Sequence, residues 1–142
     1  MKAMFKSAVH MIIKKDNKIL LQKRKGSKLW PGYYALPAGH IDEGENQYDA
    51  LVREAREELG IDLDPKKILN NYVVLRRNYF EIKDYDGKPK IMEEDKCDEL
   101  LWADADNLPE PFINYEGAFL EDRTITIYDC KTDGAYIKKS KK

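Results

Sequence analysis

Three glutamates, Glu54, Glu57 and Glu58, have the side-chain type and the spacing that metal-assisted chemistry requires. On an α-helix, where each residue advances by about 100°, their carboxylates share one arc of the surface. Like charges three and four residues apart repel, and the helical wheel directs Arg53 and Arg56 elsewhere. A solvated acidic face is the ordinary alternative. A hard divalent cation, Mg²⁺ or Mn²⁺, would compensate this charge, because such ions prefer oxygen ligands and are often shared with substrate phosphates.

One amphipathic helix must position these carboxylates. Over residues 45–59 the apolar side chains repeat every three to four positions, and Gly60 supplies a C-terminal stop. The repeat forms a single stripe that we expect to pack on a sheet, made of Tyr48, Leu51, Val52, Ala55 and Leu59. Ala50 and Gln47 are expected on the carboxylate face, where they would leave room for ions and substrate.

Short β-prone segments surround this helix and indicate an α/β protein. A hairpin is predicted over 8–15 and 19–23, with its turn at Asp16-Asn17. The segment Pro37-Ala38-Gly39 predicts a tight turn just before the helix. Further strands are expected at 33–36, 68–77, 79–85, 100–103 and 124–130. A short second helix is predicted over 114–120, and the Lys-rich end is expected to fray.

Composition limits the classes of function. The 142 residues favour one domain, and 25 Lys and Arg against 26 Asp and Glu give a net charge of −1. Duplex nucleic acid is therefore an unfavourable partner. The apolar runs are far shorter than the roughly 20 residues of a membrane span, and the first residues do not read as a secretory leader. The two cysteines, Cys97 and Cys130, are expected to be reduced and buried, so we expect a cytoplasmic protein with no membrane partner.

The region around the glutamates matches a longer pattern. It reads Gly39, five residues, Glu45, seven residues, and then Arg53-Glu54-Ala55-Arg56-Glu57-Glu58-Leu59-Gly60-Ile61. This spacing resembles the signature of the Nudix (MutT-like) hydrolases, G-x5-E-x7-R-E-U-x-E-E-x-G-U, where U is a bulky aliphatic residue. All seven fixed positions match, and the one departure is the small Ala55. Residues 30–39 also resemble the family's usual approach to this box.

The resemblance implies a fold and a reaction. The fold would be a Nudix-type α/β/α sandwich with a central mixed β-sheet, formed as one domain by residues 1–137, with 138–142 as a Lys-rich, disordered tail. The reaction would be Mg²⁺-dependent hydrolysis of a nucleoside diphosphate linked to another moiety, with Mn²⁺ able to substitute. Homodimers are common in the family, so a second copy of the chain is a possible partner.

The resemblance also implies roles within the box. Residues matching Glu54, Glu57 and Glu58 bind metal or activate water, and the backbone carbonyl matching Ala38 often adds a ligand. Arg53 matches an arginine that orients a glutamate by ion pairing. Glu45 matches a glutamate near the metal and its water.

Outside the box the candidates are fewer. Family members often recruit a further acid from a loop, and Glu94, in a segment similar to the P-E-K-C segment of MutT-like enzymes, is the candidate here. Lys23 and Arg24 could clamp phosphates. Tyr79 stands near the position of a tyrosine in diadenosine polyphosphate hydrolases of the family.

Two histidines complete the set of candidates. Gly39 and the adjacent His40 could touch phosphate, whereas we expect His10 to be neutral and hydrogen-bonded in a structural role. A nucleobase could stack on one of four aromatic side chains, Trp30, Tyr33, Tyr34 or Phe112.

Several substrates remain open. We expect cleavage of (deoxy)nucleoside triphosphates to monophosphate and pyrophosphate. Diadenosine polyphosphates are an alternative, an RNA substrate held by the Lys-rich tail is another, and a non-catalytic Nudix nucleotide-binding module is a third. ADP-ribose fits less well, because many ADP-ribose hydrolases carry a proline about sixteen residues past the box, and here no proline occurs between Pro65 and Pro89.

Overall fold

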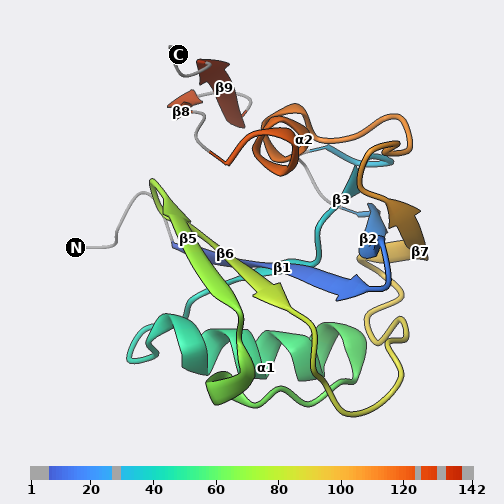
Figure 1. Cartoon of the computed structure of the whole chain (residues 1–142), viewed down its shortest axis with the longest axis vertical. Coiled ribbons are helices and arrows are strands. Elements are labelled where there is room, and N and C mark those ends of the chain that lie inside the picture. Colours follow the sequence, from blue (N-terminus) through green and yellow to red (C-terminus); the bar gives the residue numbers. More distant parts are fainter. Residues whose placement is uncertain (1–6, 27–29, 124–125, 131–133, 139–142) are drawn as a thin grey trace.

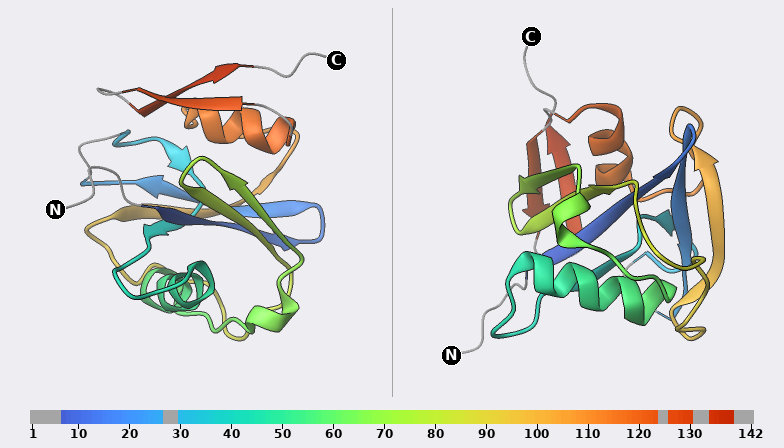
Figure 2. Two further views of the ribbon diagram at one scale, coloured as in Figure 1. Left: turned by 90° about the vertical axis from the view of Figure 1, so that its left-hand side faces the viewer. Right: turned by 60° about the horizontal axis from the view of Figure 1, so that its bottom comes forward.

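The protein folds into two helices on opposite sides of a β-sheet (Figure 1). The structure is a computed structural model that describes residues 7–26, 30–123, 126–130 and 134–138, the last two ranges by their backbone alone. The elements follow one another as β1 (Ala8–Lys15), β2 (Lys18–Arg24), β3 (Tyr34–Ala35), β4 (Ala38–His40), α1 (Gln47–Leu59), a 3₁₀ turn (Pro65–Lys67), β5 (Asn70–Val74), β6 (Arg77–Ile82), β7 (Cys97–Asp104), α2 (Asn114–Glu121), β8 (Thr126–Cys130) and β9 (Gly134–Lys138). Figure 2 shows α1 and α2 separated by the sheet, which confirms the expected α/β/α sandwich.

The sheet is mixed and is organised around β1. Its seven strands follow the order β3-β2-β1-β6-β5, with β4 also pairing with β1 and β7 with β2. The β1–β6 pair is parallel, whereas β1 is antiparallel to both β2 and β4. His10 in β1 therefore lies between Ala38 of β4 and Tyr79 of β6. Strand β1 therefore holds two neighbours in place: β4, which leads toward the glutamates, and β6.

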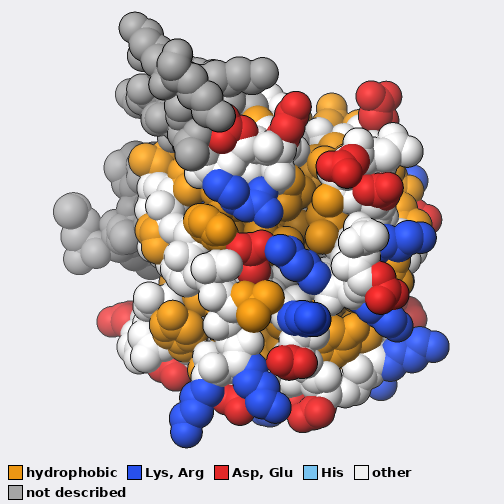
Figure 3. Space-filling model, viewed as in Figure 1, with side chains coloured by type: hydrophobic (Ala, Val, Ile, Leu, Met, Phe, Trp, Pro, Cys, Tyr) orange, Lys and Arg blue, Asp and Glu red, His pale blue; other side chains and the backbone are white. Residues whose placement is uncertain are grey.

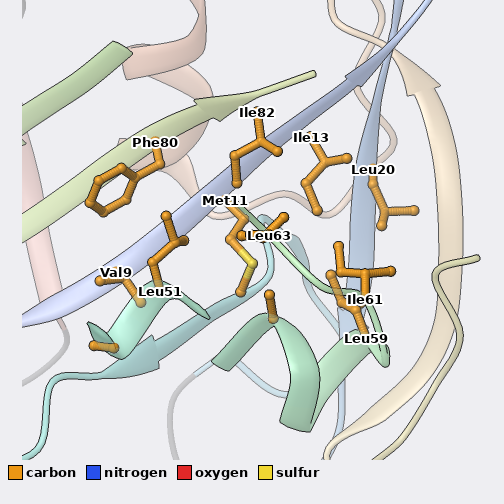
Figure 4. Packing of buried hydrophobic residues seen from close by; sticks show 12 residues of the cluster. Val9, Met11, Ile13, Leu20, Leu51, Leu59, Ile61, Leu63, Phe80 and Ile82 are labelled. Atoms are coloured by element: carbon orange, nitrogen blue, oxygen red, sulfur yellow. The ribbon is translucent and has the colours of Figure 1, made fainter. Parts of the chain in front are cut away.

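Alternation along β1 divides the core into two layers. Val9, Met11 and Ile13 are fully buried beneath α1, where Figure 4 shows them facing Leu51 and Leu59 of the helix. The other layer contains Ile12 together with Tyr79 and Phe119, and it lies toward α2. The predicted apolar stripe of α1 is confirmed at Leu51, Ala55 and Leu59, which are all buried.

The ends of α1 are set by local chemistry. The helix begins at Gln47, two residues later than predicted, because Asn46 caps it: the Asn46 side chain accepts from the Asp49 N–H at 2.8 Å, and Asp49 returns a contact to the Asn46 N–H. Gly60 ends the helix with φ +67°, a left-handed conformation that suits glycine. The placement of Ala50 on the carboxylate face is wrong, since Ala50 is fully buried in the core with Leu51.

Three other expectations differ from the structure. The tight turn predicted at 37–39 is instead the start of β4, which pairs with β1. The two strands predicted over 68–77 and 79–85 turn at Leu75, whose φ is +57°, so that β6 begins at Arg77. At the C-terminal end, β9 pairs with β8 and includes Lys138, which was assigned to the tail; residues 139–142 and the side chain of Cys130 lie outside the described part.

The cap at Asn46 gives a first test. Asn46→Ala removes the acceptor for the Asp49 N–H, so we expect the free energy of unfolding to fall by about 1 kcal/mol. Urea denaturation measures this change, with the exposed loop variant Glu43→Ala as control. An Asn46→Ala protein as stable as the wild type would show that the cap does not hold the helix start.

Candidate active site

Gly39 and Glu54 form the closest approach between β4 and α1. A Cβ atom built on Gly39 would lie 2.0 Å from Glu54 Cδ and 2.2 Å from its Oε2, distances that no side chain could tolerate. The Glu54 residue is 9% exposed, so its carboxylate is pressed against the strand. Only a glycine at position 39 leaves room for this carboxylate.

Arg53 holds three of the glutamates. Its Nε lies 2.7 Å from Glu45 Oε2, and its Nη1 lies 2.8 Å from Glu54 Oε1 and 3.0 Å from Glu57 Oε2. Its Nη2 also donates to the backbone oxygen of His40 at 2.9 Å. The helical-wheel expectation that Arg53 points away from the carboxylates is therefore wrong. The ion pair, together with the Asp42 N–H, lowers the pKa of Glu45 to about 2.

In contrast to the pKa of Glu45, that of Glu58 is raised. Burial raises the pKa of its carboxyl to about 8, the charges of Glu54 and Glu93 add to that shift, and the Ala38 N–H and Lys96 oppose it. Its Oε2 is buried and has no hydrogen-bond partner among the described residues. Burial raises the pKa of Glu54 too, although Arg53 opposes the shift. Two buried carboxylates with too little positive charge are a fitting environment for a hard cation.

Glu57 is placed differently from its two neighbours. Its side chain is 51% exposed, pairs with Arg53, and lines a neighbouring hollow with Tyr48 and Leu63. Within the described part of the chain, no three His, Cys, Asp or Glu side chains form a ready-made metal cluster. The residues that adjoin one another directly are Glu54 and Glu58, beside the backbone of Ala38 and Gly39.

A cleft of about 650 Å³ opens in front of these two carboxylates. Its acidic residues are Glu54, Glu58 and Asp42, and its lining also includes Ala38, Gly39, His40, His10, Gln22, Trp30 and Tyr115. Its cationic lining comes from separate parts of the chain, namely Arg24, Lys25, Arg76, Arg77 and Lys96. Carboxylates on one wall and cations on the others suit a metal-bound phosphate chain.

Two predicted substrate-binding residues lie outside this cleft. Lys23 and Arg24 are consecutive in β2 and face opposite sides, so Arg24 lines the cleft while Lys23 sits over the Tyr34 ring at 5.7 Å. Tyr79 is fully buried, and its ring stacks on Phe119 at 4.2 Å. Its hydroxyl therefore cannot contact a nucleotide in the cleft.

Sequence reasoning missed part of the cationic wall. Arg76 and Arg77 follow the turn at Leu75, and Lys96 lies just before β7. Arg76 and Arg77 belong to no recognisable motif, and Lys96 lies in the segment similar to P-E-K-C, where the acid Glu94 was the candidate. The two arginines can be assigned to the cleft only once the β1–β6 pairing is known. That pairing places Arg77 opposite Ala8, which also lines the cleft.

The family comparison agrees with this geometry. The model of the NUDIX domain matches residues 4–122. This chain belongs to the Nudix hydrolase family. It is 36% identical over 117 residues to an ADP-ribose pyrophosphatase of Methanocaldococcus jannaschii, covering 77% of this chain and 68% of that protein.

Other Nudix proteins support the same assignment. An asymmetrical bis(5'-nucleosyl)-tetraphosphatase of Rattus norvegicus is 32% identical over 111 residues, which are 67% of this chain and 73% of that protein. A crystal structure of a MutT NUDIX hydrolase from Burkholderia pseudomallei superposes with a TM-score of 0.71 at 28% identity, covering 84% of this chain and 98% of that one. The expectation of a MutT-like Nudix hydrolase is confirmed.

In the acidic segment outside the box, the carboxylate that lies near Glu54 and Glu58 is Glu93, and the metal-binding role of Glu94 stays a prediction. Glu94 is exposed in a turn, whereas Glu93 is half-buried and its charge raises the pKa of both Glu54 and Glu58. The Met92 N–H donates to the Glu58 carbonyl at 3.2 Å, which docks this segment on the end of α1. Lys96 Nζ lies 3.5 Å from Glu93. The sequence indicated the acidic segment, but the contact of this segment with the end of α1 shows that Glu93 is the residue beside the box carboxylates.

The contact between Gly39 and Glu54 gives a second test. Gly39→Ala should displace the Glu54 carboxylate by an ångström or more, and we expect metal-dependent turnover to fall on the order of 100-fold. Gly117→Ala is the matched control, because its Cβ would meet ordinary contacts of 3.4 Å or more. Circular dichroism would verify folding. Full activity in Gly39→Ala would show that the position of Glu54 does not matter.

The burial of Glu58 gives a third test, on protein stripped of metal with EDTA. The unfolded chain releases this proton near the ordinary pKa of 4.5, whereas the folded chain retains it up to about 8. The contribution of Glu58 to stability is therefore fully present below about pH 4.5 and is lost as the pH rises to about 8. Glu58→Gln removes this loss, so we expect its melting temperature to gain on the wild type progressively between pH 5 and 8.

Two further measurements complete that test. Mg²⁺ should raise the melting temperature of the wild type at pH 8 and have little effect on Glu58→Gln. Glu43→Gln, in an exposed loop, should follow the wild-type curve. A constant difference between Glu58→Gln and wild type across the pH range would contradict the inferred burial of the charge.

Proposed function

We propose that this Nudix protein is a Mg²⁺-dependent pyrophosphohydrolase that cleaves (deoxy)nucleoside triphosphates to monophosphate and pyrophosphate. The observation that carries the proposal is the shared lining of one cleft, in which Glu54 and Glu58 face a space also lined by Arg24, Lys25, Arg76 and Lys96. A nucleoside triphosphate carries about four negative charges at neutral pH, whereas the diphosphate bridge of ADP-ribose carries about two. The larger anion matches the cationic wall better.

The residues fit a divalent cation. The unpartnered Oε2 of Glu58 and the buried Glu54 would hold Mg²⁺ or Mn²⁺, with the Ala38 carbonyl as a further ligand. When bound, the ion would lower the pKa of a water and offset charge on the phosphates. Glu57 stays a predicted ligand that would have to exchange its partner Arg53, and Glu93 is the acid from outside the box.

The remaining residues orient the Glu54 carboxylate or offset the negative charge of the phosphates. Arg53 orients Glu54 through its Nη1, and Glu45 in turn holds the guanidinium by two contacts. His40 and Gly39 border the phosphate region, and the cations stabilise the leaving pyrophosphate. In the reaction a water oxygen adds to one phosphorus, one phosphoanhydride P–O bond breaks, and the water proton is released to a carboxylate. Glu54, fixed by Arg53, is the group that we assign to receive it.

ADP-ribose is the second candidate substrate. It is favoured by the 36% identity to a protein named as an ADP-ribose pyrophosphatase. The 32% identical tetraphosphatase also keeps dinucleoside polyphosphates as a candidate, but the tyrosine that suggested them, Tyr79, is buried away from the cleft.

The experiment measures phosphate and pyrophosphate release with Mg²⁺ and with EDTA. The panel contains nucleoside triphosphates, 8-oxo-dGTP, ADP-ribose, diadenosine polyphosphates and a 5'-triphosphorylated RNA. We expect metal-dependent release of pyrophosphate from triphosphates. Glu54→Gln and Glu57→Gln should each lower turnover by more than about 100-fold, the upper end for residues that only support a metal ligand. Glu43→Gln should retain turnover.

The outcomes separate the candidates. Turnover of ADP-ribose without action on any triphosphate would replace the first substrate with the second. Silence across the panel, with nucleotide still raising the melting temperature, would favour a nucleotide-binding module.

Partners other than the nucleotide have less support. Neither helix of the described part has the length and apolarity to cross a membrane. Figure 3 shows Lys and Arg interspersed with Asp and Glu over the face viewed, which gives no continuous basic surface there for a duplex. The homodimer and the cytoplasmic location stay predictions.

A further inference from the structure

His10 and Glu116 are a buried pair of side chains outside the Nudix box, and His10 lines the cleft. Glu116 of α2 is 2% exposed and His10 of β1 is 6% exposed. His10 Nδ1 lies 2.9 Å from Glu116 Oε2, and Glu116 Oε1 accepts from the Leu36 N–H at 2.9 Å. Two atoms with only lone pairs would repel at such a distance, so one of them carries a proton, although Nδ1 forms no aligned hydrogen bond with any described residue. A carboxyl is the stronger acid, so the proton is on His10 Nδ1.

The surroundings of His10 determine which ring edge can act. One ring face stacks on Tyr79, with centroids 4.7 Å apart, and the Nδ1 side is occupied by Glu116. His10 nevertheless lines the cleft. The edge left for the cleft is the one that carries Nε2. With the ring proton on Nδ1, beside the Glu116 carboxylate, Nε2 is a hydrogen-bond acceptor.

The part of the cleft beside His10 carries both signs of charge. The buried carboxylate of Glu116 lies behind His10 and disfavours a second negative charge next to its ring, whereas Arg77 lies over the nearby Tyr115 ring. Gln22, which is 8% exposed, is a neutral polar side chain that also lines the cleft. Tyr115, with Arg77 over its ring at 4.5 Å, supplies an aromatic surface. A neutral, planar, hydrogen-bonding group fits this lining.

We propose that His10 is a specificity-determining residue whose Nε2 accepts a hydrogen bond from an exocyclic amino group of the nucleobase, and that Glu116 sets the tautomer that makes this possible. The proposal rests on the proposed function in that it takes the substrate to be a nucleotide. It predicts a preference for amino-bearing bases over their oxo counterparts, cytosine over uracil and adenine over hypoxanthine.

The test measures binding of nucleoside monophosphates, in EDTA at about pH 8. Calorimetry or NMR titration gives dissociation constants for CMP against UMP, AMP against IMP, and ribose 5-phosphate as the probe without a base. We expect the wild type to prefer the amino member of at least one pair by about threefold to tenfold. His10→Phe, which keeps an aromatic ring against Tyr79, should reduce that ratio to about one and leave ribose 5-phosphate unchanged.

Glu116→Gln is the decisive variant, because it keeps the side-chain shape. Its amide oxygen can still accept from Leu36, while its NH₂ donates to His10 Nδ1 and moves the ring proton to Nε2. Nε2 then becomes a donor, and the preference should invert toward UMP or IMP, a change that a merely structural role would not produce. Glu121→Gln, the same substitution at an exposed position of the same helix, should behave as wild type.

The outcomes also separate this proposal from the proposed function. Equal binding of both members of each pair, binding no tighter than that of ribose 5-phosphate, or discrimination that persists in His10→Phe would overturn the base-reading role. Preserved discrimination with no metal-dependent hydrolysis would instead refute the proposed reaction and keep the subsite.

Discussion

The contact between the Gly39 backbone and the Glu54 carboxylate is the constraint on which the site depends. It requires β4 to run beside α1 with no side chain between them, and that arrangement is possible because β4 pairs with β1, the strand on which α1 packs. Arg53 strengthens this arrangement, because it donates hydrogen bonds both to the Glu54 carboxylate and to the backbone oxygen of His40 at the end of β4. A helix, a strand and the loop between them are thereby held as one unit.

The same strand, β1, connects this unit to the other side of the sheet. Its odd-numbered apolar residues support α1, and its even-numbered residues, His10 among them, face α2. Glu116 accepts from the Leu36 N–H, eighty residues away in sequence and just ahead of β4. The position of α2 is therefore coupled to the segment that carries Gly39, although α2 contains no residue of the Nudix box.

The parts of this structure that sequence could predict are the parts set by local chemistry. The hairpin β1–β2 and the helix α1 follow from turn residues, a cap and a 3.6-residue repeat, and the box residues carry their own spacing. The three-residue strand β4 could not be predicted, because its only reason to be extended is a partner some thirty positions earlier in the chain. The direction of Arg53 was missed for another reason: a wheel projects Cβ positions, whereas a long guanidinium reaches across to the neighbouring arc. Arg76, Arg77 and Lys96 meet at the cleft only through pairing of distant segments, so no window of sequence contains the cationic wall.

The repulsion among the crowded carboxylates of the box is reduced in two ways, by pairing with an arginine and by protonation of a buried carboxyl. On one side Arg53 is shared by Glu45, Glu54 and Glu57, and the pKa of Glu45 is held near 2. On the other side, Lys96 is the charged group of the described residues that favours ionisation of Glu58, and Glu93 opposes it. Burial leaves the Glu58 carboxyl protonated up to about pH 8. A protein that needed these acids only for solubility would leave both sides exposed to water. Because Arg53 partly neutralises the first group while Glu58 is buried, the lack of positive charge is greatest at Glu58, beside Glu54 and facing the cleft. A divalent cation therefore brings the largest gain in free energy there.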